Sequence, residues 1–207
     1  MAKAWLVRPN PHDKNRIKEF KSQNIVAIGW PGIGDLNNNS REDLKNLLSG
    51  TPYNLKGLAL GNAYATIDIF VNQIEPGDLI LCPNGDDIYF GVITSNYTFE
   101  PSVDNDALGY PHQRSIEWHS NKARNELSKE LRSSLKVHRT TATLNHHFKE
   151  IEALCFGLKS PIPSAHETIS ITYPLRPDFE ISFNVPKDMT ATEADRLSKY
   201  ISTLYFK

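Results

Sequence analysis

The sequence lacks several features that would place it in a class at once. It has only two cysteines, Cys82 and Cys155, too few for a disulfide framework. Both lie in apolar stretches, so we expect buried, reduced thiols. No apolar run approaches the roughly 18 residues of a membrane-spanning helix, and the N-terminus has no apolar signal segment. These absences predict a cytoplasmic protein.

The chain also lacks an excess of charge of either sign. It has 23 Lys and Arg residues against 24 Asp and Glu residues, for a formal net charge of −1. Binding to nucleic acid through bulk charge is therefore excluded, and phosphate contacts must come from a local basic patch. The length of 207 residues suits one domain of ordinary size with a small appendage.

Motifs that carry catalysis are missing as well. The glycines of "GWPGIGDL" (29–36) fit neither a phosphate-binding loop ending in Lys-Ser/Thr nor the GxGxxG spacing. None of the seven histidines is spaced with cysteines or carboxylates as a zinc site requires. The segment "EFK" (19–21) resembles part of a nuclease motif but falls in a predicted helix. We therefore predict a non-catalytic protein without metal or cofactor.

Hydrophobic periodicity predicts short strands mixed with scattered helices. The expected strands are 2–9, 25–30, 78–82, 88–94, 112–119 and the end of 131–140. The expected helices are 12–24, 40–50, 61–74 and 145–158. Ser40 and Asp43 approximate a capping box at the start of 40–50. The segment 61–74 is ambiguous, because its β-branched residues favour a strand whereas its apolar spacing fits a helix. The strands 78–82 and 88–94 flank "PNGD", and Asn-Gly is typical of a tight hairpin. This pattern favours an α+β domain whose antiparallel sheet curls into a barrel flanked by helices.

The composition changes near Lys159. Residues 159–177 are rich in proline and read as a connector, whereas the tail predicts a strand and then a helix capped by Thr190 and Glu193. We therefore divide the chain into a domain (1–157), a Pro-rich connector (158–178) and a C-terminal strand-helix extension (179–207). The extension is expected to dock onto the barrel or onto a partner.

Four segments, taken in order, resemble one known group of proteins. They are "AIGWPG" (27–32), "IEPGDLILCPNGDDIYFGVI" (74–93), "RSIEWH" (114–119) and "ELSKELRSSLKV" (126–137). Together they are similar to the EVE/YTH group of PUA-like domains, small β-barrels that bind nucleic acid and hold a modified base in an aromatic pocket. The similarity covers about residues 5–157. The chain also resembles the N-terminal targeting modules of McrB-type restriction enzymes, which scan DNA for modified bases.

The resemblance implies an aromatic pocket with Trp30 as one wall. Without it, a core position is the better expectation for Trp30. The loop before "RSIEW" should supply the other walls, and Tyr110 is the preferred second one. Trp118 is expected in the core. The predicted base-binding residues are Trp30, Tyr110, Tyr97, Phe99, Trp5 and Asn38.

Residues 112–139 form a net basic stretch in this nearly neutral chain. Such a local excess is what a footprint on phosphates requires, although a solvated basic face is the alternative. The predicted phosphate-binding residues are Arg114, Lys122, Arg124, Arg132, Lys136 and Arg139.

These features lead to one expected function and several alternatives. We expect a non-catalytic reader of a modified base, in DNA rather than RNA, that works with an effector nuclease or motor subunit in restriction or phage defence. An RNA-binding PUA-like protein is the first alternative. A nuclease or base-modifying enzyme and a nucleotide sensor are the others, and a steep salt dependence of binding separates nucleic-acid binders from a sensor.

Overall fold

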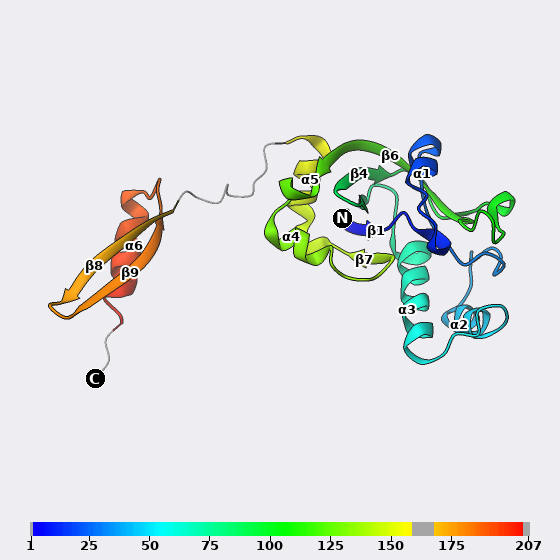
Figure 1. Cartoon of the computed structure of the whole chain (residues 1–207), viewed down its shortest axis with the longest axis horizontal. Helices are drawn as coiled ribbons and strands as arrows, with labels where there is room; N and C mark the ends of the chain where they lie inside the picture. The colour runs from blue at the N-terminus through cyan, green and yellow to red at the C-terminus, as the bar shows by residue number, and fades with distance from the viewer. Residues whose placement is uncertain (1, 159–167, 205–207) are drawn as a thin grey trace. The chain divides into compact units, whose positions relative to one another are not determined.

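The computed structural model describes residues 2–158 and 168–204. The chain divides into two compact units, with the boundary at residue 161 (Figure 1). Within the described ranges, no helix is both long enough and apolar enough to cross a membrane.

The N-terminal unit is a mixed α+β structure built on one curled sheet that forms a half-barrel. Its order is β2-β6-β4-β3-β1-β7, with β5 attached to β6. The strands are β1 (Ala4–Val7), β2 (Ile25–Ile28), β3 (Leu79–Asn84), β4 (Asp87–Ile93), β5 (Thr98–Phe99), β6 (His112–Ala123) and β7 (Thr141–Thr143). The predicted α+β class and curled sheet are confirmed.

The expectation of a wholly antiparallel barrel is wrong in one respect. Strands β1 and β3 run parallel, whereas the other pairs in this sheet are antiparallel. The long connection between them contains β2 and several helices, and a parallel pair requires such a crossover. Within residues 2–158, no ladder joins the two end strands β2 and β7.

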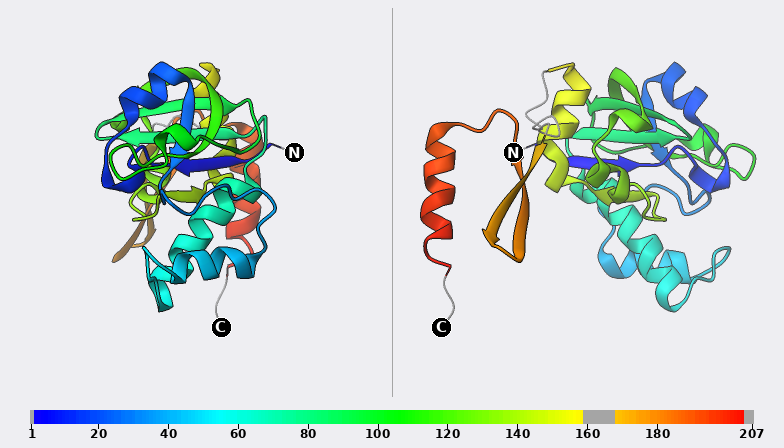
Figure 2. Two further views of the ribbon diagram at one scale, coloured as in Figure 1. Left: turned by 90° about the vertical axis from the view of Figure 1, so that its right-hand side faces the viewer. Right: turned by 60° about the vertical axis from the view of Figure 1, so that its left-hand side comes forward.

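Helices flank this sheet (Figure 2). They are α1 (Ile17–Gln23), α2 (Arg41–Ser49), α3 (Gly57–Asp68), α4 (Lys129–Ser134) and α5 (Phe148–Phe156). The ambiguous segment 61–74 is helical as predicted, and a π-helical turn at Ile69–Gln73 continues α3. At the start of α2, Asp43 N donates to Ser40 Oγ and Ser40 N donates to the Asp43 carboxylate, as the sequence predicts.

The predicted hairpin is present, with a tighter turn than expected. Asn84 pairs with Asp87, so only Gly85 and Asp86 lie between β3 and β4. Gly85 has the positive φ, 63°, that such a turn requires.

Side chains on the sheet alternate between two apolar clusters. Trp5 and Val7 of β1 belong to one cluster, together with Phe20 and Phe70. Ala4 and Leu6 belong to the other, with side chains of α4 and α5. Trp118 packs against the first cluster and its Nε1 donates to Phe20 O, which agrees with its expected core position. Cys82 and Cys155 are free and buried, as predicted.

The C-terminal unit is a hairpin followed by a helix. It contains β8 (Thr168–Arg176), β9 (Phe179–Pro186) and α6 (Ala191–Ile201). The predicted strand and helix in 179–207 are therefore present, but the predicted connector (158–178) is wrong for 168–176, which form β8. Proline misled the sequence interpretation, because Pro174 is tolerated in a strand of a two-stranded ribbon, where both strands are edges. Residues 159–167 of that connector lie outside the described residues.

Candidate functional site

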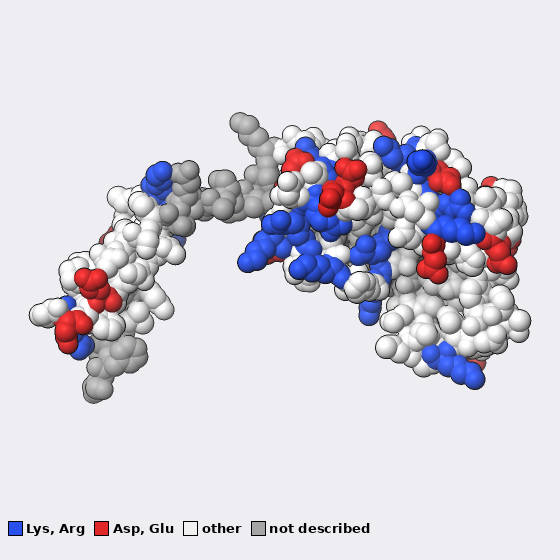
Figure 3. Space-filling view, in the orientation of Figure 1, with Lys and Arg blue, Asp and Glu red and all other residues white. Residues whose placement is uncertain are grey.

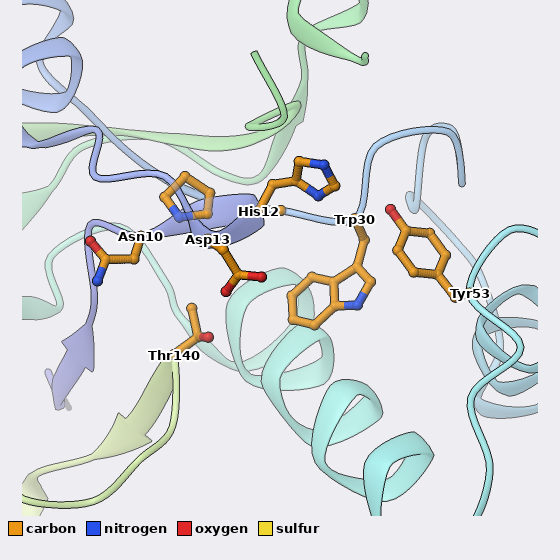
Figure 4. Close-up of a pocket in the computed structure, with 8 residues that line it drawn as sticks. Asn10, His12, Asp13, Trp30, Tyr53 and Thr140 are labelled. Carbon is orange, nitrogen blue, oxygen red and sulfur yellow. The ribbon is translucent and has the colours of Figure 1, made fainter. Parts of the chain in front are cut away.

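A pocket of about 210 Å³ lies where the end of β2 meets the turn after β1. Its lining residues are Asn10, Pro11, His12, Asp13, Gly29, Trp30, Tyr53 and Thr140. The indole of Trp30 and the carboxylate of Asp13 face the same space, and Thr140 lies beside Asp13 (Figure 4). The imidazole of His12 points away from that space. The pocket therefore combines an aromatic wall with hydrogen-bonding side chains.

Three residues of this pocket have left-handed backbone conformations. The φ angles are 67° for Trp30, 58° for Asp13 and 49° for His12. A residue other than glycine costs roughly 1–2 kcal/mol in this region, less for Asp because its short side chain can hydrogen-bond locally. Such strain concentrates at functional sites and persists only where the surroundings enforce it.

Contacts just after Trp30 hold this conformation. Tyr53 Oη donates to Pro31 O at 2.7 Å, and Gly32 N donates to Asp104 Oδ1 at 2.6 Å. Desolvation raises the pKa of Tyr53 to about 12, so its hydroxyl stays protonated and able to donate.

The buried side chain of His112 lies next to the backbone of Trp30. His112 stacks on Tyr97, and its Nδ1 lies 2.8 Å from Tyr97 Oη. Its Nε2 lies 3.4 Å from Trp30 O. Leu36 N donates to Tyr97 Oη, so a tautomer with the proton on His112 Nε2 satisfies all three contacts. Desolvation lowers the pKa of His112 to about 4, which leaves the ring neutral at pH 7.

A larger basic groove of about 660 Å³ adjoins the pocket. The groove is lined by Arg8, Asn10, Asp13, Arg124, Leu135, Lys136, His138, Arg139 and Thr140. Asn10, Asp13 and Thr140 belong to both cavities. Lys and Arg side chains gather over α4 and β7, the region of the chain that flanks this groove (Figure 3).

Arg8 organises the far side of the groove. Its guanidinium donates to Leu135 O, Val137 O and Arg139 O, and so holds 135–139 against the end of β1. Burial and then the charge of Arg124 lower the pKa of Arg8, which means that two cations lie near each other. Within residues 2–158, no carboxylate forms an ion pair with Arg8, Arg124, Lys136 or Arg139. Cations gathered without carboxylate partners favour an anionic ligand.

The structure brings together only some of the predicted phosphate-binding residues. Arg124, Lys136 and Arg139 line the groove, whereas Lys122 and Arg132 do not. The prediction for Arg114 is wrong, because its side chain is 2% exposed and donates to Phe70 O, Val71 O and Ser95 O. It holds the π-helical turn after α3 against β6.

Most of the predicted base-binding aromatics lie in the core. Trp5 is buried, and its Nε1 donates to Asp78 Oδ2 at 2.7 Å. Tyr97 is buried beside His112, and Phe99 packs on the same ring. Tyr110, the preferred second wall, is 4% exposed under the guanidinium of Arg16. The loop residues were misassigned because β5 returns the loop to β6 and turns its aromatics inward.

Asn38 also lies outside the pocket. It is exposed in the left-handed region (φ 64°) and does not line the pocket. Sequence reasoning missed Asn10, Asp13, Tyr53, Thr140 and, in the groove, Arg8. The segment "RPNPHD" (8–13) carried the only signal, a cluster of polar and proline residues directly after a strand. No sequence pattern pointed to Tyr53 or Thr140, because both lie far from Trp30 in the sequence and reach the pocket only through the tertiary fold.

Among the residues that the structure describes, no group of three or more His, Cys, Asp or Glu side chains is arranged to hold a metal ion.

Comparison with known proteins gives a family but no relative of known role. Neither the curated proteins nor the solved structures contain a match. The profile of one protein family, described as a domain of unknown function (DUF8426), matches residues 5–145. This span includes every residue that lines the pocket and the groove. The chain therefore belongs to the DUF8426 family.

Proposed function

We propose that this protein is a non-catalytic reader of a modified base in DNA. A flipped base occupies the pocket at Trp30, and the adjoining phosphates lie in the basic groove. The observation that carries this proposal is that the pocket and the groove share Asn10, Asp13 and Thr140. A single nucleotide can thus place its base in one cavity and its phosphate in the other.

The size of the pocket suits a base. Its 210 Å³ lies below the roughly 300–1,000 Å³ of pockets for drug-sized ligands. Stacking on an aromatic side chain such as Trp30 is worth roughly 1–3 kcal/mol per base, which offsets the few kcal/mol needed to unstack it. A buried methyl group adds about 0.8 kcal/mol, so a methyl mark alone gives only a few-fold preference.

Hydrogen bonds to the base edge supply the remaining selectivity. The carboxylate of Asp13 offers hydrogen-bond acceptors to the base edge. It therefore favours a base with an exocyclic amino group, such as cytosine N4 or adenine N6, over thymine. Asn10, at the junction of the two cavities, offers both a donor and an acceptor.

The sequence resemblance supports DNA as the target and a PUA-like barrel as the fold. The segments around Trp30, the β3–β4 hairpin and β6 are similar to those of EVE/YTH domains and of McrB-type targeting modules. The half-barrel sheet is compatible with such a fold. We accordingly propose an effector nuclease or motor subunit as the partner that acts once the base is bound.

The test is fluorescence anisotropy with matched duplexes. The set contains unmodified DNA and DNA with N6-methyladenine, 5-methylcytosine, 5-hydroxymethylcytosine or N4-methylcytosine, each paired with the RNA equivalent. Trp30→Ala removes the stacking wall. Lys18→Ala is the matched control, since Lys18 is exposed on α1 and lines neither cavity.

We expect one modified DNA to bind at least several-fold more tightly than the unmodified duplex. Trp30→Ala should abolish that preference, and Lys18→Ala should keep it. If the modified RNA binds more tightly than the modified DNA, the target is RNA and not DNA. Absence of binding to every duplex at low salt would refute the proposal.

A further inference from the structure

Two half-buried arginines, Arg8 and Arg124, line the basic groove in fixed positions. Nε and Nη2 of Arg8 donate to carbonyls of the 135–139 segment, and Nε and Nη2 of Arg124 donate to Gly85 O. Among the residues that the structure describes, none accepts a hydrogen bond from Nη1 of either guanidinium. Each arginine therefore keeps a donor group for a ligand, at a position that its backbone contacts have already set.

The positive charge of this groove exceeds what its own carboxylate can balance. Lys136 and Arg139 line it together with the two arginines, and Asp13 is the only acidic residue among the lining side chains that the structure describes. After burial, the charge of Arg124 is the next cause that lowers the pKa of Arg8, so the two guanidiniums repel each other. An anion with more than one charge relieves this repulsion.

The groove is also larger than one phosphate group needs. Its volume of about 660 Å³ is about three times the 210 Å³ of the pocket. It falls within the roughly 300–1,000 Å³ that is typical of sites for whole small molecules. A ligand that fills the groove therefore extends well beyond the phosphate that adjoins the base.

The density of charge distinguishes two kinds of phosphate ligand. A polynucleotide strand carries one negative charge per phosphate, and a sugar separates each phosphate from the next. A free nucleotide ends in a phosphate group with about −1.5 to −2 charges at pH 7, and the phosphates of a triphosphate are joined directly to one another. The two neighbouring guanidiniums of Arg8 and Arg124 fit the concentrated charge of a free nucleotide better than the spaced charges of a strand.

We propose that the pocket and the groove also bind a free nucleoside triphosphate, with its base against Trp30 and its terminal phosphates at Arg8 and Arg124. Asp13 lies between Trp30 and Asn10 in Figure 4, so the sugar passes these junction residues before the phosphates enter the groove. This inference rests on the function proposed above, because it keeps the base in the pocket and the phosphates in the groove. The nucleotide and DNA then exclude each other, and the nucleotide regulates the binding of DNA.

The experiment is isothermal titration calorimetry of the full chain in the absence of DNA. The ligands are deoxycytidine and deoxyadenosine triphosphates, the corresponding monophosphates, and inorganic tripolyphosphate. We expect at least one triphosphate to bind about ten-fold or more tightly than its monophosphate, because each lost charge-assisted hydrogen bond costs a factor of that order. Trp30→Ala should weaken the binding of this triphosphate but not that of tripolyphosphate.

Arg124→Ala tests the role of the groove in the same titrations. It should reduce the ratio of the triphosphate affinity to the monophosphate affinity. Lys122→Ala is the matched control, because it removes one charge two positions earlier in the chain without lining the groove, and it should keep the ratio. Lys136→Ala, at an exposed position of the groove, tests the same ratio if Arg124→Ala does not fold.

Three results would overturn the inference. Equal affinities for triphosphate and monophosphate would show that the groove holds only one phosphate, and tripolyphosphate binding as tightly as the nucleotide would show that the pocket holds no base. A triphosphate that binds without displacing a labelled modified duplex in the anisotropy assay would lie elsewhere on the chain. Failure of both triphosphates to bind while the duplex binds refutes this inference alone. Binding of a triphosphate without binding of any duplex supports the nucleotide site and refutes the reader of DNA.

Discussion

Gly29 lies directly against the backbone of His12. A Cβ atom at position 29 would sit 2.7 Å from His12 N, which is closer than real Cβ atoms approach. The turn that carries Asp13 into the pocket therefore depends on the absence of a side chain at the end of β2. Gly109 also lies close to His12, because a Cβ atom at position 109 would sit 2.7 Å from His12 Cβ.

This contact predicts that Gly29→Ala destabilises the fold and displaces the 10–13 turn. The neighbour is backbone and cannot rotate away, so we expect a loss of about 1–3 kcal/mol in the free energy of unfolding. Gly61→Ala in α3 is the control, because a Cβ atom at position 61 would enter open space and alanine favours a helix. Urea denaturation compares the two variants. Equal stability of Gly29→Ala and wild type would contradict the close approach.

The left-handed conformation of Trp30 leads to a second prediction. Trp30→Ala and Trp30→Gly remove the same packing, but only alanine keeps the steric penalty at φ 67°. We expect Trp30→Gly to be more stable than Trp30→Ala by about 1 kcal/mol. Thermal or chemical denaturation measures this difference. The reverse order would show that Trp30 is unstrained.

The buried His112 predicts a pH dependence of stability. Its pKa is about 4 in the folded chain, below the roughly 6.5 of an unfolded histidine, so the unfolded state binds more protons between these values. Its contribution is complete above pH 6.5 and is lost as the pH falls towards 4, at up to about 1.4 kcal/mol per pH unit.

Denaturation of wild type and His112→Gln at several pH values checks this expectation. The stability advantage of wild type should shrink as the pH falls from 6.5 to 4. Phe99→Leu alters the packing against the same ring but removes no titrating group, so its stability deficit should stay constant. A constant advantage over His112→Gln would mean that the ring titrates normally.

The basic groove predicts a specific loss of phosphate contacts. Lys136→Ala with Arg139→Ala should weaken binding to modified and unmodified duplexes alike, since phosphates carry no sequence information. The slope of log affinity against log salt should fall by about 0.9 for each lost contact on duplex DNA. Anisotropy titrations at several salt concentrations measure the slope. Lys18→Ala, which removes one charge outside the groove, should leave it unchanged.

The buried Arg114 predicts a purely structural defect. Arg114→Ala leaves the carbonyls of Phe70, Val71 and Ser95 without their donor, so we expect a loss of about 3 kcal/mol or more in stability. Where the variant is folded, its salt slope for DNA binding should match wild type. Lys122→Ala, on the same strand but not buried, should change stability by less than about 0.5 kcal/mol. A smaller slope of log affinity against log salt for Arg114→Ala would show that Arg114 contacts a phosphate.

Local patterns in the sequence predicted most of the elements. Capping boxes at Ser40 and Thr190, the turn at Gly85 and the apolar periodicity of 61–74 depend on residues a few positions apart. Interactions at that range act in the same way wherever the segment lies in the fold. Strand β8 was missed because Pro174 argues against a strand unless that strand is known to lie at the edge of a sheet.

Local sequence patterns did not predict which basic residues belong to the candidate site. The basic stretch of 112–139 was visible in the sequence, but charge count alone does not distinguish the exposed Arg139 from the buried Arg114. Strand β6 turns Arg114 inward, whereas Arg8 holds Arg139 at the groove. Burial depends on the pairing of strands distant in the chain, which is a tertiary property.

The sequence by itself determined the α+β class and the local elements, because these follow from short-range chemistry, whereas Trp30 was selected through the resemblance to a family. Only the tertiary structure decided which side chains accompany Trp30. It placed Asn10, Asp13 and Thr140 in the pocket instead of Tyr110, and Thr140 lies far from the other two in the sequence. The physical reason is that a pocket forms where separate segments meet, and the meeting of those segments is fixed by the packing of the whole sheet.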